Sequence, residues 1–339
     1  MKTKTFGRTL LVPLVLGFLV FAVSACDTTV QSGSSSGRIL PNITGGAGEV
    51  LVVCDNYIWD GATGEKLKDI LQEEFPGLPQ SEPLFDVTHI TPASFDNLFK
   101  FHRSVLLITI KESADEPTVS FRKDVWAKSQ IVAQLEAKNK AELDQLLNDN
   151  AGKIQNFLIH YDRQRLTDSY QDSKDLEIQK LMAQDHQIRL AIPRGYNIDF
   201  SNSTFSSISI ETPEFSQVIQ VYEYPGTEDD LSSDKILEKR NEMVGKYVKG
   251  PNEGSYMSTS KAYPPIFYDL SRNNTEIVET RGLWELEGGY MGGPFVSHSV
   301  FDAKRNRILV VEGYLYYPNQ KKRVKIRQLE AIIYSLEIL

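Results

Sequence analysis

The spacing of apolar residues divides the chain into two regions. In the first, short apolar runs alternate with segments whose apolar side chains recur every three or four positions. Strands are predicted within residues 49–55, 84–90, 104–110, 118–124 and 130–137, and helices within 63–75, 93–99 and from 140 to about 184. The highly charged part of the last helix, residues 161–175, is typical of a solvated helix or of a joint between two halves.

From residue 188 onward, polar and apolar residues mostly alternate, as in strands with one buried face. Strands are predicted within 188–193, 196–200, 206–212, 216–224, 266–270, 275–287, 294–302 and 306–317, and helices within 231–250 and 323–339. Runs of strands bracketed by helices indicate the α+β class. We therefore predict an N-terminal α+β half, residues 49–186, and a C-terminal antiparallel-sheet half with a closing helix, residues 187–339. Each half is expected to hold a mainly antiparallel sheet packed with helices.

The N-terminus has the pattern of a secretory signal. Lys2, Lys4 and Arg8 precede an apolar run of 14 residues, 10–23, whereas a membrane-spanning helix needs about 20. The run ends in small residues, which is typical of a cleaved signal peptide. We therefore predict a signal peptide over residues 1–25. The alternatives are an ordinary signal peptide followed by a chance cysteine, or a short anchor helix.

The residues before Cys26, Val-Ser-Ala, resemble the lipobox that lipoprotein signal peptidase recognises. The resemblance implies cleavage before Cys26 and a diacylglycerol, carrying fatty acids such as palmitate, on its thiol. Ser, Thr and Gly dominate the following residues, which predicts a lipidated flexible tether over residues 26–48. We expect a lipid-anchored protein on the inner or outer membrane of a cell envelope, with its body in the periplasm or on the surface.

Charge and cysteine usage narrow the class of partner. Without the three basic residues of the signal peptide, the chain has 34 Lys and Arg against 45 Asp and Glu, a net charge of −11. Such an acidic body argues against nucleic acid as a partner. Cys54 follows an apolar run and has no basic residue beside it, so we expect a buried and unreactive thiol.

Residues 284–299 contain four glycines within six positions. They lack the spacing of a phosphate-binding loop, and strand-like alternation lies on both sides of them. We interpret the glycines as a connection between two strands, with Tyr290 and Met291 at its tip. The alternative is a loop in which these two side chains contact a ligand or a partner.

Two pairs of side chains are further candidates for chemistry or binding. Glu285 and Glu287 would share one face of a strand, about 7 Å apart by strand rise, a separation that suits a glycosidase. A solvated face is the more ordinary interpretation of two such acids. Tyr314 and Tyr316 would share a face with Glu312, where they could stack on a sugar ring or pack within the sheet.

No metal or cofactor is expected, because the five histidines are scattered and no zinc-binding motif is present. A nucleophile elbow is also missing from the sequence. Ser297, His298 and Ser299 are adjacent, but neighbours on a strand point to opposite faces, so they cannot form a catalytic pair with each other.

Four stretches resemble an uncharacterised lipoprotein family that is known mainly from Bacteroidota and catalogued as a domain of unknown function. They are FRKDVWAKSQIV, RGLWELEGGYMGGPFVSHS, RNRILVVEGYLYYPNQKKR and IRQLEAIIYSL. The resemblance covers most of the chain from Glu49 onward, and its C-terminal part is the most specific. It implies an envelope lipoprotein and assigns no catalytic residues.

Three functions agree with these observations. The favoured one is a non-catalytic envelope lipoprotein whose body binds or scaffolds an envelope protein or a glycan. The second is an envelope glycan hydrolase, which predicts that paired carboxylates such as Glu285 and Glu287 lie in a cleft. The third is a small-ligand-binding lipoprotein, which predicts an enclosed apolar pocket.

Overall fold

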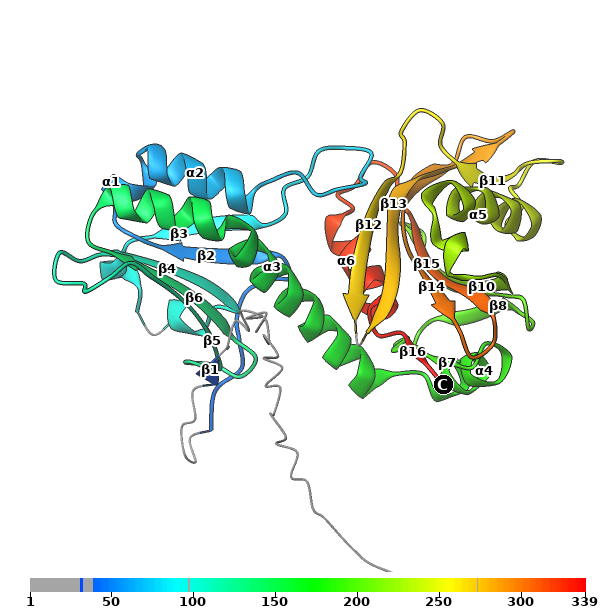
Figure 1. Ribbon diagram of the computed structural model, residues 1–339, viewed down its shortest axis with the longest axis horizontal. Helices are drawn as coiled ribbons and strands as arrows, with labels where there is room; N and C mark the ends of the chain where they lie inside the picture. Colours follow the sequence, from blue (N-terminus) through cyan, green and yellow to red (C-terminus); the bar gives the residue numbers. More distant parts are fainter. Residues whose placement is uncertain (1–30, 33–38, 97, 273) are drawn as a thin grey trace, which may run out of the picture.

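The computed structural model describes residues 31–32, 39–96, 98–272 and 274–339. Two bodies, each built on its own sheet, are joined by one long helix, α3 (Lys140–Ser173) (Figure 1). The α+β class that the periodicity predicts is confirmed. No helix within the described ranges is long and apolar enough to cross a membrane. The predicted signal peptide and Cys26 lie outside these ranges.

The N-terminal body contains a six-stranded sheet in the order β1-β5-β6-β4-β2-β3. Its strands are β1 (Gln31–Ser32), β2 (Glu49–Val53), β3 (Asp86–Ile90), β4 (Ser104–Ile110), β5 (Thr118–Lys123) and β6 (Ile131–Ala137). All neighbouring strands pair in parallel except β5 and β6, which are antiparallel. This sheet therefore differs from the mainly antiparallel one that we predict for this half.

The burial of this sheet explains the difference. Helix α2 (Ala62–Leu71) and α3 pack on the face of Val52 and Leu106, while Leu51 and Val105 belong to a second cluster with Phe95 and Phe99 on the other face. Strands covered on both sides are continuous apolar runs, as parallel strands usually are. Their sequence therefore lacks the alternation that would distinguish the two kinds of sheet.

Short helices complete this body, and caps mark the ends of the long one. Helix α1 (Asn56–Trp59) precedes α2, and the helix predicted within 93–99 forms two 3-10 turns, η1 (Pro92–Ser94) and η2 (Phe99–Phe101). Asn139 caps α3 by accepting the Glu142 N–H at 3.0 Å. The helix stops before Asp175, which caps α4 (Leu176–Asp185). The predicted helical stretch with breaks is thus confirmed.

The C-terminal body is an eight-stranded sheet in the order β11-β13-β14-β15-β10-β9-β8, with β12 also paired to β13. Its strands are β8 (Asn197–Ser201), β9 (Phe205–Glu211), β10 (Ser216–Pro225), β11 (Tyr256–Thr259), β12 (Ile266–Arg272), β13 (Thr275–Glu287), β14 (Gly292–Asp302) and β15 (Arg307–Tyr316). Every pairing in it is antiparallel, as the alternation predicts.

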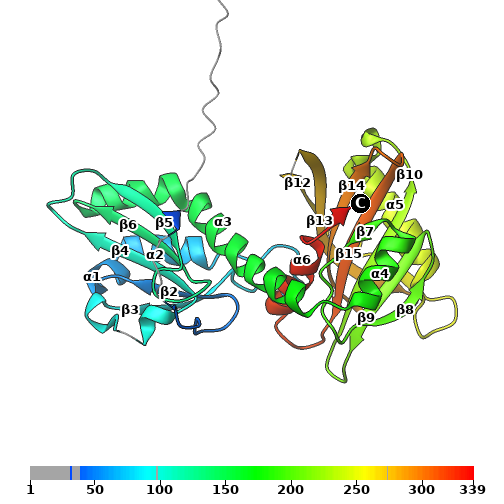
Figure 2. The ribbon, with the colours of Figure 1, turned by 90° about the horizontal axis from the view of Figure 1, so that it is seen from below.

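Helices cover both faces of this sheet (Figure 2). The closing helix, α6 (Arg323–Ile333), buries Leu329, Ile332 and Ile333 against one face. On the other face, α5 (Ser233–Tyr247) buries Met243 and Val244. The turn η3 (Glu228–Leu231) precedes α5, and a two-stranded ribbon pairs β7 (Ile188–Arg189) with β16 (Glu337–Ile338).

The start of α6 is bound by the N-terminal body. The two carboxylate oxygens of Glu82 accept the backbone N–H groups of Lys322, at 2.6 Å, and of Arg323, at 3.0 Å. These are donors that a helix leaves unpaired in its first turn, and a negative charge there is favoured by the helix dipole. A residue far away in sequence thus caps this helix and holds the two bodies together.

A second joint lies on the charged part of α3. Asp162 is buried and pairs with Arg103 at 3.1 Å and with Arg165 at 3.2 Å. It also accepts the Gly48 N–H, and the guanidinium of Arg327 on α6 lies 3.9 Å away. From the sequence, residues 161–175 are interpreted either as a solvated helix or as a joint between two halves. The contacts of Asp162 show that this part of the helix is a joint.

The residues just before β2 are bonded to the N-terminal body. The Thr44 N–H donates to the Phe101 carbonyl and the Lys128 N–H donates to the Pro41 carbonyl, both at 2.8 Å. Residues 41–48, which composition assigns to the tether, are therefore part of the folded body.

Candidate functional site

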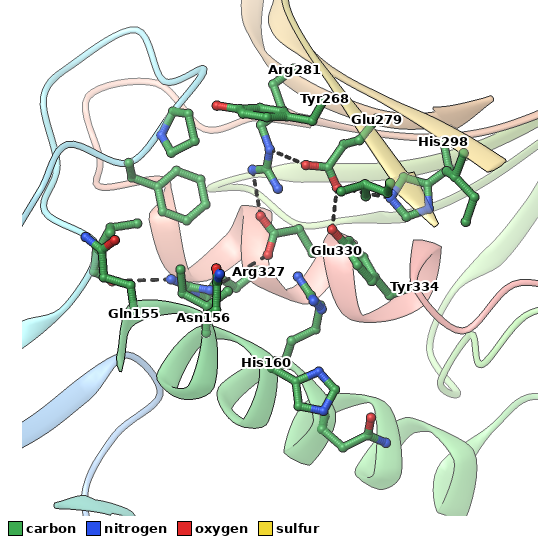
Figure 3. Close-up of a pocket in the computed structure, with 18 of the residues that line it drawn as sticks. Gln155, Asn156, His160, Tyr268, Glu279, Arg281, His298, Arg327, Glu330 and Tyr334 are labelled. Atoms are coloured by element: carbon green, nitrogen blue, oxygen red, sulfur yellow. Dashed lines mark hydrogen bonds and ion pairs between the residues drawn. The ribbon is translucent and has the colours of Figure 1, made fainter. Parts of the chain in front are cut away.

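A cleft of about 740 Å³ lies between the two bodies (Figure 3). Its walls are α3 on one side and β12 with β13 on the other, and α6 contributes from below the sheet. The polar and charged side chains that line it are Glu73, Glu74, Gln155, Asn156, His160, Arg163, Gln164, Thr167, Ser271, Arg272, Glu279, Arg281, His298, Arg327 and Glu330. Because both bodies supply these walls, the joints described above set the width of the cleft.

A buried ionic network forms the inner end of the cleft. Arg281 donates from Nε to Glu279 at 2.7 Å and pairs through Nη1 with Glu330 at 2.7 Å. The second oxygen of Glu279 accepts the Tyr334 hydroxyl at 2.7 Å and lies 3.0 Å from Nε2 of His298 (Figure 3). The network ties β13 and β14 to the end of α6.

Electrostatics fix the charge state of this network. Burial alone would raise the pKa of Glu279, but the charge of Arg281 and the hydrogen bond from His298 outweigh it and hold that pKa well below 4.5. Burial lowers the pKa of His298, with Glu279 opposing it, so the imidazole is neutral at pH 7. Neutral His298 then donates from Nε2 to the carboxylate, which leaves Nδ1 as an acceptor.

The two carboxylates at the inner end of the cleft are engaged in ion pairs rather than free for proton transfer. Glu279 is ionised and fully hydrogen-bonded, so it cannot act as a general acid near neutral pH. Glu330 is held by Arg281, and Arg327 lies within 3.9 Å of it. The described part of the chain contains no group of three His, Cys, Asp or Glu residues placed to hold a metal ion.

Two arginines of the cleft have no carboxylate partner among the residues that the structure describes. The guanidinium carbon of Arg163 lies 3.3 Å from the ring centroid of Tyr334, which is a close cation–π contact. Arg272 donates to the carbonyl oxygens of Tyr334 and Leu336, the latter at 3.0 Å. Burial lowers the pKa of Arg272, and the nearby charge of Arg163 lowers it further.

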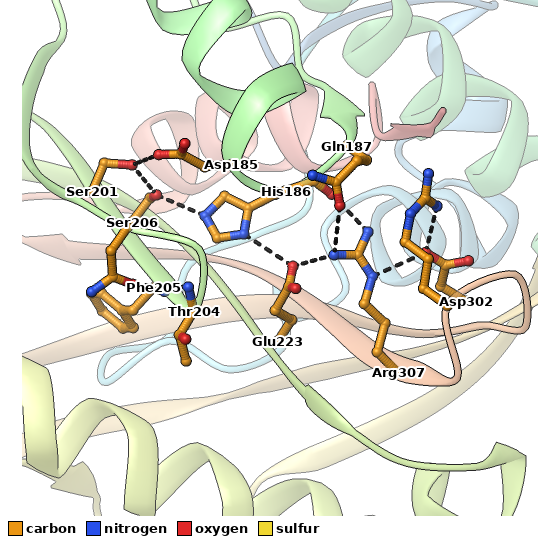
Figure 4. A network of polar contacts seen from close by, with 12 residues as sticks. Asp185, His186, Gln187, Ser201, Thr204, Phe205, Ser206, Glu223, Asp302 and Arg307 are labelled. Atoms are coloured by element: carbon orange, nitrogen blue, oxygen red, sulfur yellow. Dashed lines mark hydrogen bonds and ion pairs between the residues drawn. The ribbon is translucent and has the colours of Figure 1, made fainter.

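A second polar network lies inside the C-terminal body (Figure 4). Nε2 of His186 lies 2.7 Å from Oγ of Ser206, and its Nδ1 lies 3.1 Å from Glu223, the order of groups found in a Ser-His-acid triad. However, Ser206 and His186 are both 0% exposed, and Arg307 also binds Glu223. A substrate cannot reach this serine, so the network is a structural link between the end of α4 and the sheet.

The acids chosen from the sequence do not line the cleft. Glu285 and Glu287 lie at the far end of β13, opposite β11. Glu287 pairs with Lys261 at 3.0 Å, and that lysine is 83% exposed. A glycan hydrolase that used Glu285 and Glu287 would need both of them in a cleft. Neither residue lines the cleft between the bodies.

The glycine-rich segment is a connection between two strands, as interpreted from the sequence. It joins β13 to β14 through residues 288–291, and Gly288 has a φ of +75°. The side chain of Tyr290 is 85% exposed at its tip, whereas Met291 packs against the cluster that contains Trp284. Of the two predicted contact residues, Tyr290 is thus the accessible one.

The tyrosine pair packs within the sheet. The rings of Tyr314 and Tyr316 lie 5.3 and 6.4 Å from the Trp284 ring, centroid to centroid. Glu312, on the same face, is fully buried and bonded by Arg240 at 2.7 and 2.8 Å. Helix α5 covers this face. Tyr314 and Tyr316 therefore pack within the protein, as in the second of the two interpretations from the sequence.

Sequence reasoning missed the residues that shape the cleft. Glu279 and Arg281 stand in a strand whose neighbouring positions, Ile277 and Leu283, are apolar on the same face. An acid and a base two positions apart in such a strand are a sign of a buried pair. Arg163 stands in a segment that reads as a solvated helical face, and nothing in the sequence distinguishes it from its charged neighbours.

Comparisons with known proteins give families without an assigned activity. Residues 175–335 match the family model described as "Domain of unknown function (DUF4837)", and residues 44–171 match "Domain of unknown function (DUF8532)". No curated protein matches the chain. Two solved structures are similar over 45% of this chain and 90% of theirs, each at 10% identity. They are the Ran-binding protein Mog1p of Saccharomyces cerevisiae, with a TM-score of 0.31, and a mutant of protein Mog1, with a TM-score of 0.29. In its two consecutive parts, the chain is thus similar to two families of domains of unknown function.

Proposed function

We propose that the protein is a cell-envelope lipoprotein that binds a ligand in the cleft between its two bodies and does no chemistry on it. The observation that carries this proposal is the cleft itself, in which the carboxylates of the inner end are held by Arg281 while Arg163 and Arg272 face no carboxylate. Concave sites with a few convergent polar groups are the usual form of ligand pockets.

The envelope location is supported by the first part of the sequence. A basic n-region, a short apolar run and a lipobox-like Val-Ser-Ala before Cys26 agree with one another. Lipid on Cys26 would hold the protein on the inner or outer membrane. The folded body would begin before Pro41, because β1 (residues 31–32) already pairs with β5 and the Pro41 carbonyl accepts the Lys128 N–H.

The ligand is a small molecule, or a short segment of an envelope protein or glycan. A cleft of about 740 Å³ encloses a molecule of drug-like size, and not a folded partner. A second candidate function, docking of an envelope protein, is favoured by one observation: Tyr290 is 85% exposed at the tip of the β13–β14 connection. Tyrosine is common at the centre of protein interfaces.

Native mass spectrometry of the full-length lipoprotein, extracted from envelopes, tests the proposal. Asn156 is an exposed residue of the α3 wall, so Asn156→Trp should fill the cleft without disturbing a core. Lys153→Trp, on the same helix and outside the cleft, is the matched control. We expect an additional bound mass on the wild type and on the control, and its loss from Asn156→Trp. Equal occupancy of all three proteins would contradict the cleft as the binding site.

A further inference from the structure

We infer that the ligand of the cleft is an amphipathic oxyanion, with one carboxylate or phosphate group bound by Arg163 and Arg272 and an apolar body along the rest of the cleft. The inference rests on the proposed function, because it names the class of ligand that the same cleft would hold. Three features of the cleft support it. Arg163 and Arg272 have no ion-pair partner among the described residues, Arg163 is stacked on Tyr334, and part of the cleft wall is apolar.

The positive charge that remains uncompensated is concentrated at one end of the cleft. Arg281 is neutralised by Glu279 and Glu330, and Arg327 lies between Asp162 and Glu330. Arg163 and Arg272 have no such partner in the described ranges. Both guanidinium groups contact Tyr334: that of Arg163 lies over its ring, and that of Arg272 donates to its carbonyl oxygen. The two guanidinium groups therefore share one neighbourhood, which attracts a negative group.

The way Arg163 is held leaves its donors free for a ligand. Its guanidinium lies against the ring of Tyr334, 3.3 Å from the centroid, and makes no hydrogen bond to another described residue. Stacking fixes the plane of the group without using its N–H donors. A planar, pre-oriented guanidinium is the group that binds a carboxylate or a phosphate through two parallel bonds.

The rest of the cleft offers apolar surface. Ile159 on α3 and Leu270 on β12 line it and are half-buried, whereas Phe75, Leu84 and Ile277 behind them belong to the core. Tyr268 on β12 adds a ring that is 38% exposed. A small inorganic anion would leave this surface in water, whereas a ligand with an acyl or aromatic body would cover it.

The test is isothermal titration calorimetry of the full-length lipoprotein in nanodiscs, with empty nanodiscs as the blank. The probes are 4-phenylbutyrate, 4-phenylbutyl phosphate, neutral 4-phenylbutanol and inorganic phosphate. We expect at least one of the two amphipathic acids to bind at least about tenfold more tightly than the alcohol and than inorganic phosphate. The comparison of carboxylate with phosphate identifies which acidic group the site prefers.

Variants of Arg163 test whether this arginine binds the acidic group of the ligand. Arg163→Gln should weaken binding of the preferred acid by about tenfold or more, since a charge-assisted contact is lost, and should leave binding of the alcohol unchanged. Lys153→Gln, on the same helix, should change neither. Arg163→Lys keeps the charge and should restore part of the affinity. Thermal unfolding of each variant shows whether it is folded.

Two results would overturn the inference. Equal binding of alcohol and acids, unaffected by Arg163→Gln, would reject the oxyanion and leave the proposed binding function standing. Failure of both acids to bind would reject this class of ligand as well. The proposed function is tested separately by mass spectrometry, where retention of the bound mass by Asn156→Trp would contradict it.

Discussion

Glu279 and Arg281, two positions apart on one face of β13, are joined by a 2.7 Å bond at the inner end of the cleft. Through Glu330, the same arginine reaches α6, so this pair couples the sheet to the helix that the N-terminal body caps. A buried pair of this kind contributes little net stability by itself, but breaking it leaves an uncompensated charge. The structure of the cleft therefore depends on every residue of this buried network.

Replacing one member of this pair should be costly. Glu279→Gln leaves Arg281 with one carboxylate partner fewer, and we expect a loss of about 3–5 kcal/mol in the free energy of unfolding at pH 7. Urea denaturation measures it. The control on the same strand is Glu287→Gln, whose partner Lys261 is exposed; it should cost less than about 1 kcal/mol. Similar costs for the two variants would contradict the role given to the network.

The same carboxylate predicts how stability depends on pH. Since the pKa of Glu279 in the folded protein lies below its ordinary value of 4.5, its contribution is complete above about pH 4.5 and is lost as the pH falls further toward the folded pKa. The difference in unfolding free energy between wild type and Glu279→Gln should therefore shrink between pH 5 and pH 3, about the range in which the free carboxyl titrates. A difference that stays constant over this range would show that the pKa is not depressed.

Gly288, in the β13–β14 connection, and Gly293, at the start of β14, should respond differently to alanine. A Cβ on Gly293 would lie 2.0 Å from the Leu315 carbonyl oxygen, so Gly293→Ala requires the backbone to move and should cost about 3 kcal/mol or more. Gly288 has space for a Cβ but a φ of +75°, so Gly288→Ala should cost about 1–2 kcal/mol. Thermal or urea unfolding of the two variants checks the order, and the reverse order would contradict this description of the turn.

The cap supplied by Glu82 should stabilise the junction of the bodies. Glu82→Ala leaves two buried N–H groups of α6 without an acceptor and should cost about 2–3 kcal/mol. Hydrogen exchange in the first turn of α6 should become faster at the same time. Glu116→Ala, in an exposed loop, is the control. Unchanged exchange in α6 would mean that Glu82 does not cap it.

The proposed lipid anchor has its own test. Cys26→Ala should leave an unprocessed precursor that incorporates no labelled palmitate, because the thiol proposed to carry the lipid is gone. Metabolic labelling followed by fractionation of the cells measures both effects. Labelling that survives this change would overturn the interpretation of the first 26 residues.

The elements of the fold were largely predictable because each has a local signal. The alternation in β13 and the i, i+3, i+4, i+7 spacing in α6 are written in adjacent residues. The parallel sheet was not predictable, since β2 and β4 are buried on both faces and their apolar runs carry no alternation.

The cleft could not be predicted from the sequence, for a different reason. It is formed by residues more than a hundred positions apart, such as Arg163 and Tyr334, whose contact exists only after the two bodies have been joined. Glu285 and Glu287 attracted attention as a pair on one strand face, whereas Glu279, on the same face, is the acid of this strand that lines the cleft. Which end of a strand faces a neighbouring body is a property of tertiary structure.

Site-specific photo-crosslinking in living cells tests the central claim most directly. A photoreactive amino acid is placed in the full-length protein at position 156, inside the cleft, and in a second protein at position 153, one turn away on the same helix and outside it. We expect a single dominant adduct from position 156, absent from position 153 and weakened by Arg163→Gln. The same adducts from both positions, or none from position 156 in intact cells, would contradict a ligand bound between the two bodies.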